Sequence, residues 1–285
     1  MRKIKWNINV DKLEITYQAT QQVRDALAAI KDRKELNEVS VVRVDTPMPY
    51  QHNFLLFGKD YNDERGIFER QIGTLYFGSL NKYRQYIYIS YNNAALYDTC
   101  LLASRFYIEE ALGLNFYRVS KIDIALDLNI SVVSRIYKLY KDETYSLIIL
   151  DKRYADLDEK VKGVLHISTG TRKYPFKNRS FYIEDKGKSL ALRCYNKSEE
   201  LRYSEKKYIP NIAGTSPMYR LEVSLRNHKN VEKSLKQLGV TDSGYVYSNL
   251  QNVDFLVRLF IVTLNRLIRV GKGRKSYNLL DILIQ

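Results

Sequence analysis

Hydrophobic and polar residues alternate along many short stretches of this chain. Near the start, Ile4, Trp6, Ile8 and Val10 alternate with polar positions, which predicts a strand with one buried face. The same kind of pattern predicts strands over residues 39–44, 54–57, 73–77, 84–91, 121–129, 164–168, 181–184, 189–196 and 219–226. Residues 185–188 form a short polar connection that predicts a hairpin between two of these strands.

Helical spacing of apolar residues marks several segments between the strands. It predicts helices over residues 20–36, 96–112, 134–147 and 198–207, and Gly113 is expected to end the second. The part after residue 229 is expected to be mostly helical, including an apolar helix over 253–270. The predicted fold is α+β, with a central, mainly antiparallel sheet and helices on one face. Residues 1–229 would form an α+β domain that carries the chemistry, and residues 230–285 a helical segment for DNA recognition or subunit contact.

Two aspartates occupy the polar face of the strand predicted at 121–129. Asp123 and Asp127 share this face with Lys121, whereas Ile122, Ile124 and the following leucines face the core. Aspartate is depleted in strands, so the pair indicates either a hard cation held by carboxylates or a solvated face with lysine partners. Because four residues of strand span roughly 13 Å, both carboxylates reach one ion only if the strand bends.

Two further strands carry polar residues with chemical potential. Glu222 lies mid-strand between Arg220 and Arg226, a pattern that fits a metal ligand with phosphate contacts and equally a cross-strand salt bridge. Tyr195 lies between Arg193 and Lys197, and nearby positive charge favours the phenolate of a tyrosine nucleophile. The alternative for this tyrosine is a packed surface residue between solvated cations.

The charge balance indicates a polyanionic partner. The chain has 46 Lys and Arg against 32 Asp and Glu, a net charge of +14. Residues 172–207 hold 11 basic and 5 acidic residues with interleaved aromatic rings, a combination that suits single-stranded or distorted DNA.

Several other classes of function are disfavoured by missing motifs. The three histidines are far apart, two cysteines cannot form a disulfide scaffold, and neither a P-loop nor a Gly-x-Ser-x-Gly elbow occurs. The start lacks the apolar stretch of a signal peptide, and the most apolar helix carries several charges. We therefore expect a cytoplasmic protein that does not contact a membrane.

Four segments taken in order resemble the replication initiation factor family. They are Tyr86-Ile-Tyr-Ile-Ser90 followed by a helix, Lys121-Ile-Asp-Ile-Ala-Leu-Asp127, Arg193-Cys-Tyr-Asn-Lys197 and Tyr219-Arg-Leu-Glu222. The family comprises Rep-trans rolling-circle plasmid initiators, with related filamentous-phage initiators and relaxases. The resemblance covers residues 73–227, about half of the chain.

This resemblance implies a site-specific, metal-dependent nicking-closing enzyme that initiates rolling-circle replication. Tyr195 would be the nucleophile that forms a 5′-phosphotyrosine, with Lys197 and Arg193 offsetting phosphate charge, and Asp123, Asp127 and Glu222 would hold Mg²⁺ or Mn²⁺. Glu184 would be an additional acid. The residues expected to contact DNA are Arg172, Lys173, Arg179, Lys188, Arg220, Arg226, Arg274 and Lys275.

The implied partners are replication-origin DNA, as a single-stranded or hairpin-extruded nick site, a host helicase and DNA polymerase, and a second copy in a homodimer. Two other functions stay open. A conjugative relaxase would use the same chemistry at a transfer origin. A non-enzymatic origin-binding protein on the same fold would bind DNA without metal dependence and without a covalent adduct.

Overall fold

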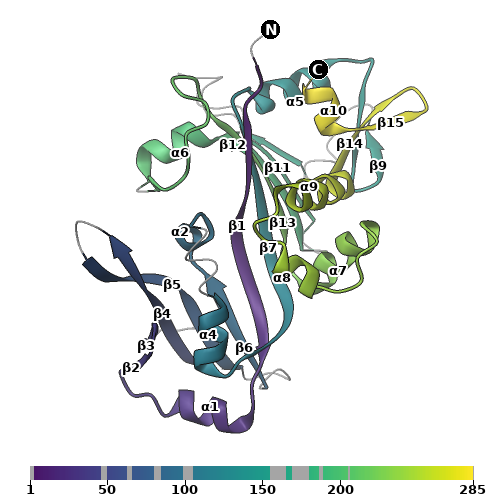
Figure 1. The fold of residues 1–285 in the computed structure, drawn as a ribbon. Coiled ribbons are helices and arrows are strands. Elements are labelled where there is room, and N and C mark those ends of the chain that lie inside the picture. The colour runs from purple at the N-terminus through teal and green to yellow at the C-terminus, as the bar shows by residue number, and fades with distance from the viewer. Residues whose placement is uncertain are drawn as a thin grey trace. The chain divides into compact units, whose positions relative to one another are not determined.

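The computed structural model describes residues 3–45, 50–62, 66–79, 85–98, 105–154, 165–168, 180–185, 189–204 and 206–284. The chain has an α+β fold built on a large antiparallel sheet, as predicted (Figure 1). Its contacts divide it into two compact units. Unit 1 comprises residues 1–10, 123–242 and 249–285, and unit 2 comprises residues 11–122 and 243–248. Strands β1 (Trp6–Gln18) and β7 (Asn115–Leu128) contribute residues to both.

Unit 2 contains an antiparallel run of strands. From β1 the order is β6 (Tyr86–Tyr91), β5 (Gly66–Ser79), β4 (Tyr50–Asn62), β3 (Val39–Arg43) and β2 (Arg33–Leu36). Its helices are α1 (Gln21–Ala28), α2 (Asn93–Leu96), α4 (Arg105–Leu112) and α8 (Gly244–Ser248). Alternate residues such as Leu13, Ile15, Ile87 and Ile89 are completely buried, so one face of these strands forms the core.

A buried polar network explains why the short α8 segment belongs to unit 2. The Arg105 guanidinium donates to the Tyr247 carbonyl at 3.1 Å, and the Tyr247 hydroxyl donates to Glu109. The Tyr17 and Tyr91 hydroxyls lie 3.0 Å apart in the same interior. Burial raises the pKa of the Glu109 carboxyl above its usual range, despite these hydrogen bonds. Tyr247 of α8 is thus held by Arg105 and Glu109, two residues that are distant from it in sequence.

Unit 1 contains the strands that carry the predicted site residues. The order is β10 (Leu165–Ser168), β11 (Ser180–Asp185), β12 (Leu190–Asn196), β13 (Tyr219–Leu225), then β7 and β1. Leu192 pairs with Val223 and Cys194 with Leu221, and all four side chains are fully buried. Helices α5 (Val132–Lys141), α7 (His228–Gln237) and α9 (Val253–Leu267) pack against these strands, and α6 (Lys197–Tyr203) follows β12 (Figure 1).

A second, four-stranded sheet completes unit 1. Its order is β15 (Lys275–Asn278), β14 (Ile268–Lys272), β8 (Ser146–Ile149) and β9 (Lys152–Tyr154), and helix α10 (Leu279–Ile284) follows. Leu150 and Asp151, between β8 and β9, have positive φ angles of 50° and 66°, as the two-residue hairpin turns of twisted strands require.

Four predicted helices end earlier in the structure, and one of them, predicted over 198–207, ends as α6 at Tyr203. The helix predicted over 20–36 stops at Ala28, because residues 33–36 pair with β3 across a turn in which Asn37 has a φ of 54°. The helix predicted over 134–147 stops at Lys141, and the one over 253–270 at Leu267, because β8 and β14 pair with each other. Part of the predicted helix over 96–112 lies outside the described residues, and its described end forms α4.

The C-terminal part is therefore helical with one hairpin inserted. Helices α7, α8, α9 and α10 fall after residue 227, with β14 and β15 between the last two. The compact units also do not separate at residue 229, where the sequence suggested a boundary, since residues on both sides of it belong to unit 1. The hairpin predicted over residues 181–196 is present as β11 and β12.

Candidate active site

Tyr195 and Glu222 meet on one face of unit 1. They lie on the neighbouring strands β12 and β13, whose register pairs Arg193 with Glu222 and Tyr195 with Arg220. The Tyr195 hydroxyl donates to Glu222 Oε2 at 3.4 Å, a long hydrogen bond, and an Arg193 guanidinium nitrogen lies 3.3 Å from Glu222 Oε1. The Tyr195 phenol, the Glu222 carboxylate and the Arg193 guanidinium therefore lie next to one another on this face of the sheet.

The three side chains differ in how they face solvent. The Glu222 side chain is 4% exposed, whereas that of Arg193 is 47% exposed. Tyr195 is half-buried. Arg193 contacts Glu222 with one part of its guanidinium group, and much of its side chain is exposed. Solvent, or a phosphate, therefore reaches this guanidinium directly.

Asp127 and Arg220 form a buried ion pair next to this group. Arg220 Nε donates to Asp127 Oδ1 and a terminal nitrogen donates to Oδ2, both at 2.7 Å. The two side chains are 1% and 0% exposed. We had expected Asp127 to hold a metal ion and Arg220 to contact DNA, but burial and this bidentate pairing commit each to the other.

The Asp127–Arg220 contact shows that the polar residues of β7 and β13 lie on the same face of the sheet. Arg220 and Glu222 are two residues apart on β13, and Asp123 and Asp127 are four apart on β7, so each set lies on one side of its strand. Since Arg220 contacts Asp127, Asp123 and Glu222 lie on the same face of neighbouring strands. Asp123 is 9% exposed. The strand pattern had suggested an outward polar face, whereas these side chains are largely buried.

The carboxylates form a limited set of metal ligands. Within the described residues, no cluster of three or more His, Cys, Asp or Glu side chains is arranged to hold a metal ion. Asp127 is engaged by Arg220, so Asp123 and Glu222 are the predicted ligands that lie outside this ion pair. Two carboxylates still fit Mg²⁺, which proteins bind through one or two carboxylates together with water and substrate phosphates.

Lys197 lies beside Tyr195 but is buried. Its side chain is 1% exposed, its ammonium forms an ion pair with Glu200, and it lies 5.8 Å from the centre of the Tyr195 ring. Lys206 also pairs with Glu200, at 2.8 Å. We had expected Lys197 to offset phosphate charge directly, whereas here it packs under the tyrosine ring and is neutralised by Glu200.

Sequence reasoning missed the role of Glu200. The signal was available, because Lys197 and Glu200 are three residues apart in a helix that starts at Lys197, which places them on one helical face. Burial alone would raise the pKa of the Glu200 carboxyl, but hydrogen bonds from Lys197 and Lys206 outweigh it and lower the pKa below its usual range.

The β11 side of the group adds Tyr182, Glu184 and Arg226. Tyr182 pairs in register with Arg193, whose guanidinium carbon lies 5.9 Å from the tyrosine ring centre. Arg226, expected to contact DNA, is 32% exposed; it forms an ion pair with Glu184 and donates to the Tyr182 hydroxyl at 3.3 Å. Glu184, expected as an additional acid, is therefore neutralised by Arg226.

Two of the remaining residues expected to bind DNA are in the described part of the chain. Arg274 and Lys275 are exposed at the turn of the β14–β15 hairpin, next to Gly273 with a φ of 57°. The sequence predicts a helical segment for both residues, whereas they lie in a β-hairpin. Arg172, Lys173, Arg179 and Lys188 lie outside the described residues.

Comparisons with known proteins find resemblance in structure only. No family model matches the sequence, and no curated protein matches it. Among solved structures, a rolling circle replication initiator protein from Geobacillus stearothermophilus aligns with a TM-score of 0.48 and 12% identity, over 98% of this chain and 96% of that chain. The di-domain ARO/CYC StfQ from the steffimycin biosynthetic pathway aligns with a TM-score of 0.21 and 11% identity, over 90% and 96% of the two chains.

One structural finding bears on a membrane role. In the described part of the chain, no helix combines the length and the apolar character needed to cross a membrane.

Proposed function

We propose that this protein is a DNA strand transferase that starts rolling-circle replication by nicking one strand at an origin. The observation that carries the proposal is the contact of the Tyr195 hydroxyl with Glu222 Oε2 at 3.4 Å, with Arg193 on the other carboxylate oxygen. The net charge of +14 supports a nucleic-acid substrate. The ordered resemblance of the four segments to replication initiators points to the same chemistry.

In this mechanism the Tyr195 oxygen attacks the scissile phosphorus. A bond forms between the tyrosine oxygen and phosphorus, and the bond from phosphorus to the 3′ oxygen breaks. Glu222 is within reach to accept the tyrosine proton, and the departing 3′ oxygen takes a proton from solvent. Since one phosphodiester replaces another, the step needs no ATP and runs in both directions.

The nearby cations and carboxylates would bind the phosphate, hold the metal ion and position the strands. Arg193, whose side chain is exposed, would contact a non-bridging phosphate oxygen. Asp123 and Glu222 would hold Mg²⁺ or Mn²⁺, which supplies charge neutralisation at the phosphate when bound. The Asp127–Arg220 pair positions β13 against β7, and Lys197 supports the tyrosine ring from below.

The test is covalent capture of DNA. The protein is incubated with Mn²⁺ and labelled single-stranded oligonucleotides from its own replicon, and denaturing gel electrophoresis then separates any adduct. We expect the wild type to form an adduct, and Tyr195→Phe to form none, because the nucleophilic oxygen is missing. Chelation of the metal should also prevent adduct formation.

Tyr203→Phe is the matched control. Tyr203 ends helix α6 and is 88% exposed, so this variant should fold and form the adduct at the wild-type level. Adduct formation by Tyr195→Phe would refute the assignment of the nucleophile. Metal-independent DNA binding with no adduct from the wild type would instead support a non-enzymatic origin-binding protein.

A further inference from the structure

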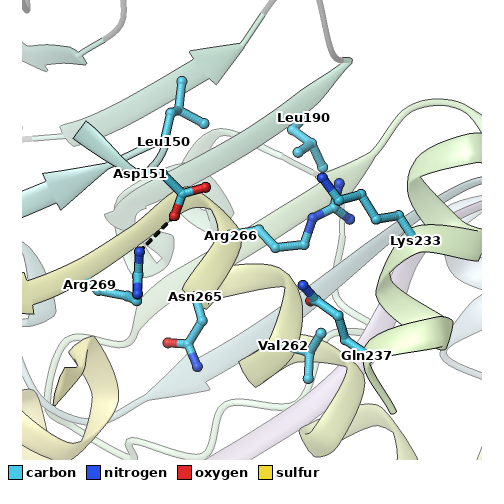
Figure 2. Close-up of a pocket in the computed structure, with 9 residues that line it drawn as sticks. All are labelled: Leu150, Asp151, Leu190, Lys233, Gln237, Val262, Asn265, Arg266 and Arg269. Atoms are coloured by element: carbon cyan, nitrogen blue, oxygen red, sulfur yellow. Dashed lines mark hydrogen bonds and ion pairs between the residues drawn. The ribbon is translucent and has the colours of Figure 1, made fainter. Parts of the chain in front are cut away.

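Unit 1 contains a cavity of about 430 Å³ that takes no part in the candidate active site (Figure 2). Its lining comes from helices α7 and α9, from Arg269 on β14, from the turn between β8 and β9, and from Leu190 at the start of β12. Leu190 and Tyr195 are five residues apart on β12, so their side chains point to opposite faces of the strand. The cavity therefore opens on the face of β12 away from the tyrosine.

Positive charge dominates the lining of this cavity. Lys233, Arg266 and Arg269 contribute three cations, and Asp151 is the acid that lines it. Asp151 pairs with Arg269 at 2.6 Å, as Figure 2 shows, which leaves an excess of two positive charges. An open cavity with such an excess attracts an anion from solution.

Arg266 is held rigidly without a charged partner. Its guanidinium donates to the Asn230 carbonyl at 3.0 Å, to Asn230 Oδ1 at 2.6 Å and to Ser234 Oγ at 2.6 Å. All three acceptors are neutral, and no carboxylate of the described residues forms an ion pair with Arg266. Burial lowers the pKa of this guanidinium, an effect that Asp151 opposes only in part. A bound anion would supply the missing compensation.

Asn265, another residue of the lining, has a polar atom without a hydrogen-bond partner among the described residues. Asn265 Oδ1 is buried and forms no hydrogen bond within the described structure. A buried amide oxygen without a donor is costly, and this oxygen is itself closed to solvent. Leu150, Leu190 and Val262 add apolar surface to the same lining. The cavity thus offers cations and apolar walls.

We propose that this cavity binds a phosphate-bearing ligand of nucleotide size. Arg266 and Lys233 would contact the phosphate, and the apolar residues would contact a base or sugar. The cavity volume lies within the range of small-molecule sites. The phosphate could come from a free nucleotide or from a nucleic-acid strand, and the experiment separates these two sources.

The test is isothermal titration of the full-length protein with four probes. They are dAMP, deoxyadenosine, inorganic phosphate and a short 5′-phosphorylated single-stranded oligonucleotide. We expect dAMP to bind and deoxyadenosine not to bind, because the phosphate is the recognised group. Lys233→Gln should weaken dAMP binding about tenfold, as expected for the loss of one charged hydrogen bond.

Lys236→Gln is the matched control, because Lys236 is exposed on the same helix but does not line the cavity. It should bind dAMP like the wild type. Binding of the oligonucleotide alone, weakened by Lys233→Gln and unchanged in Lys236→Gln, would assign the site to a nucleic-acid strand. Absence of binding by every phosphate probe, or equal binding by the wild type and Lys233→Gln, would overturn the proposal.

This inference is independent of the proposed function. Tyr195→Phe should retain dAMP binding, and Lys233→Gln should retain adduct formation. The two proposals can therefore fail separately.

Discussion

At the scale of single residues, burial changes what a charged side chain can do. The sequence shows Asp127 and Arg220 as polar positions on two strands, and either would suit a phosphate or metal contact. Their bidentate pair, at 2.7 Å for both bonds, removes them from solvent. Glu222 and Arg193 contact each other beside Tyr195, and the proposed function gives these two residues and Asp123 their roles toward a substrate. The proposed site is thus smaller than the set of acids and bases that the sequence pattern selected.

Asp127→Asn tests this structural role. It leaves the Arg220 charge buried without its partner, so the free energy of unfolding should fall by about 3–5 kcal/mol. Urea denaturation followed by circular dichroism measures the change. The double variant Asp127→Leu with Arg220→Met is the control, since replacing both charges with apolar groups should restore most of the stability. A negligible loss in Asp127→Asn would contradict a structural role for the pair.

At the scale of elements, the junction of β12 and α6 connects the tyrosine to a charged cluster. Helix α6 starts at Lys197, directly after β12 ends at Asn196, and the Asn196 side chain accepts from the Glu199 backbone nitrogen as a helix cap. This abrupt change of element turns Lys197 inward, under the Tyr195 ring and against Glu200. The ion pair therefore fixes the end of the strand that carries the tyrosine.

Glu200→Gln tests this junction through its pH dependence. Because the pKa of Glu200 is lowered in the folded state, its contribution to stability is present above the unfolded pKa of about 4.3 and is lost as pH falls through the lower folded value. At pH 7 the variant should lose roughly 1–3 kcal/mol of unfolding free energy. The difference from the wild type should shrink in acid, where both carry a neutral side chain.

Glu199→Gln serves as the control for this prediction. Glu199 pairs with Arg202, whose side chain is 66% exposed, so its loss should cost less than about 1 kcal/mol. Thermal and urea unfolding of both variants at pH 7 and pH 3 provide the comparison. Equal stability of Glu200→Gln and Glu199→Gln at pH 7 would show that the cluster does not support the junction.

At the scale of the whole molecule, the excess of positive charge is distributed among different roles. Residues 258–275 hold six basic residues and no acid in one continuous stretch. In the structure, Arg266 and Arg269 line the cavity, whereas Arg274 and Lys275 are exposed at the turn of the β14–β15 hairpin. A single basic run in the sequence therefore contributes residues both to the cavity and to an exposed hairpin.

The exposed hairpin gives a salt-dependence prediction. If Arg274 and Lys275 each neutralise one DNA phosphate, replacing both with glutamine should reduce the slope of log K against log salt by about 2 on duplex DNA. Fluorescence anisotropy over a range of salt concentrations measures the slope. Replacement of Lys31 and Lys34, two exposed lysines of unit 2, is the matched control. The same slope in the hairpin variant and the wild type would exclude the hairpin from the DNA contact.

The sequence alone determined which residues can share a strand face, because alternation is a local property of the chain. It correctly predicted the β11–β12 hairpin and the strand around Glu222. It also predicted that Tyr195 and the buried Cys194 point to opposite faces of β12. Local spacing could not end the first predicted helix at Ala28, because residues 33–36 are recruited by pairing with β3.

Only the tertiary structure decided which charges meet. Asp127 and Arg220 are 93 residues apart in the chain, and no local pattern specifies that contact. The cavity likewise draws its cations from α7, α9 and β14, which come together only when the unit folds. The physical reason is that alternation is set by neighbours along the chain, whereas burial and ion pairing depend on packing between segments distant in sequence.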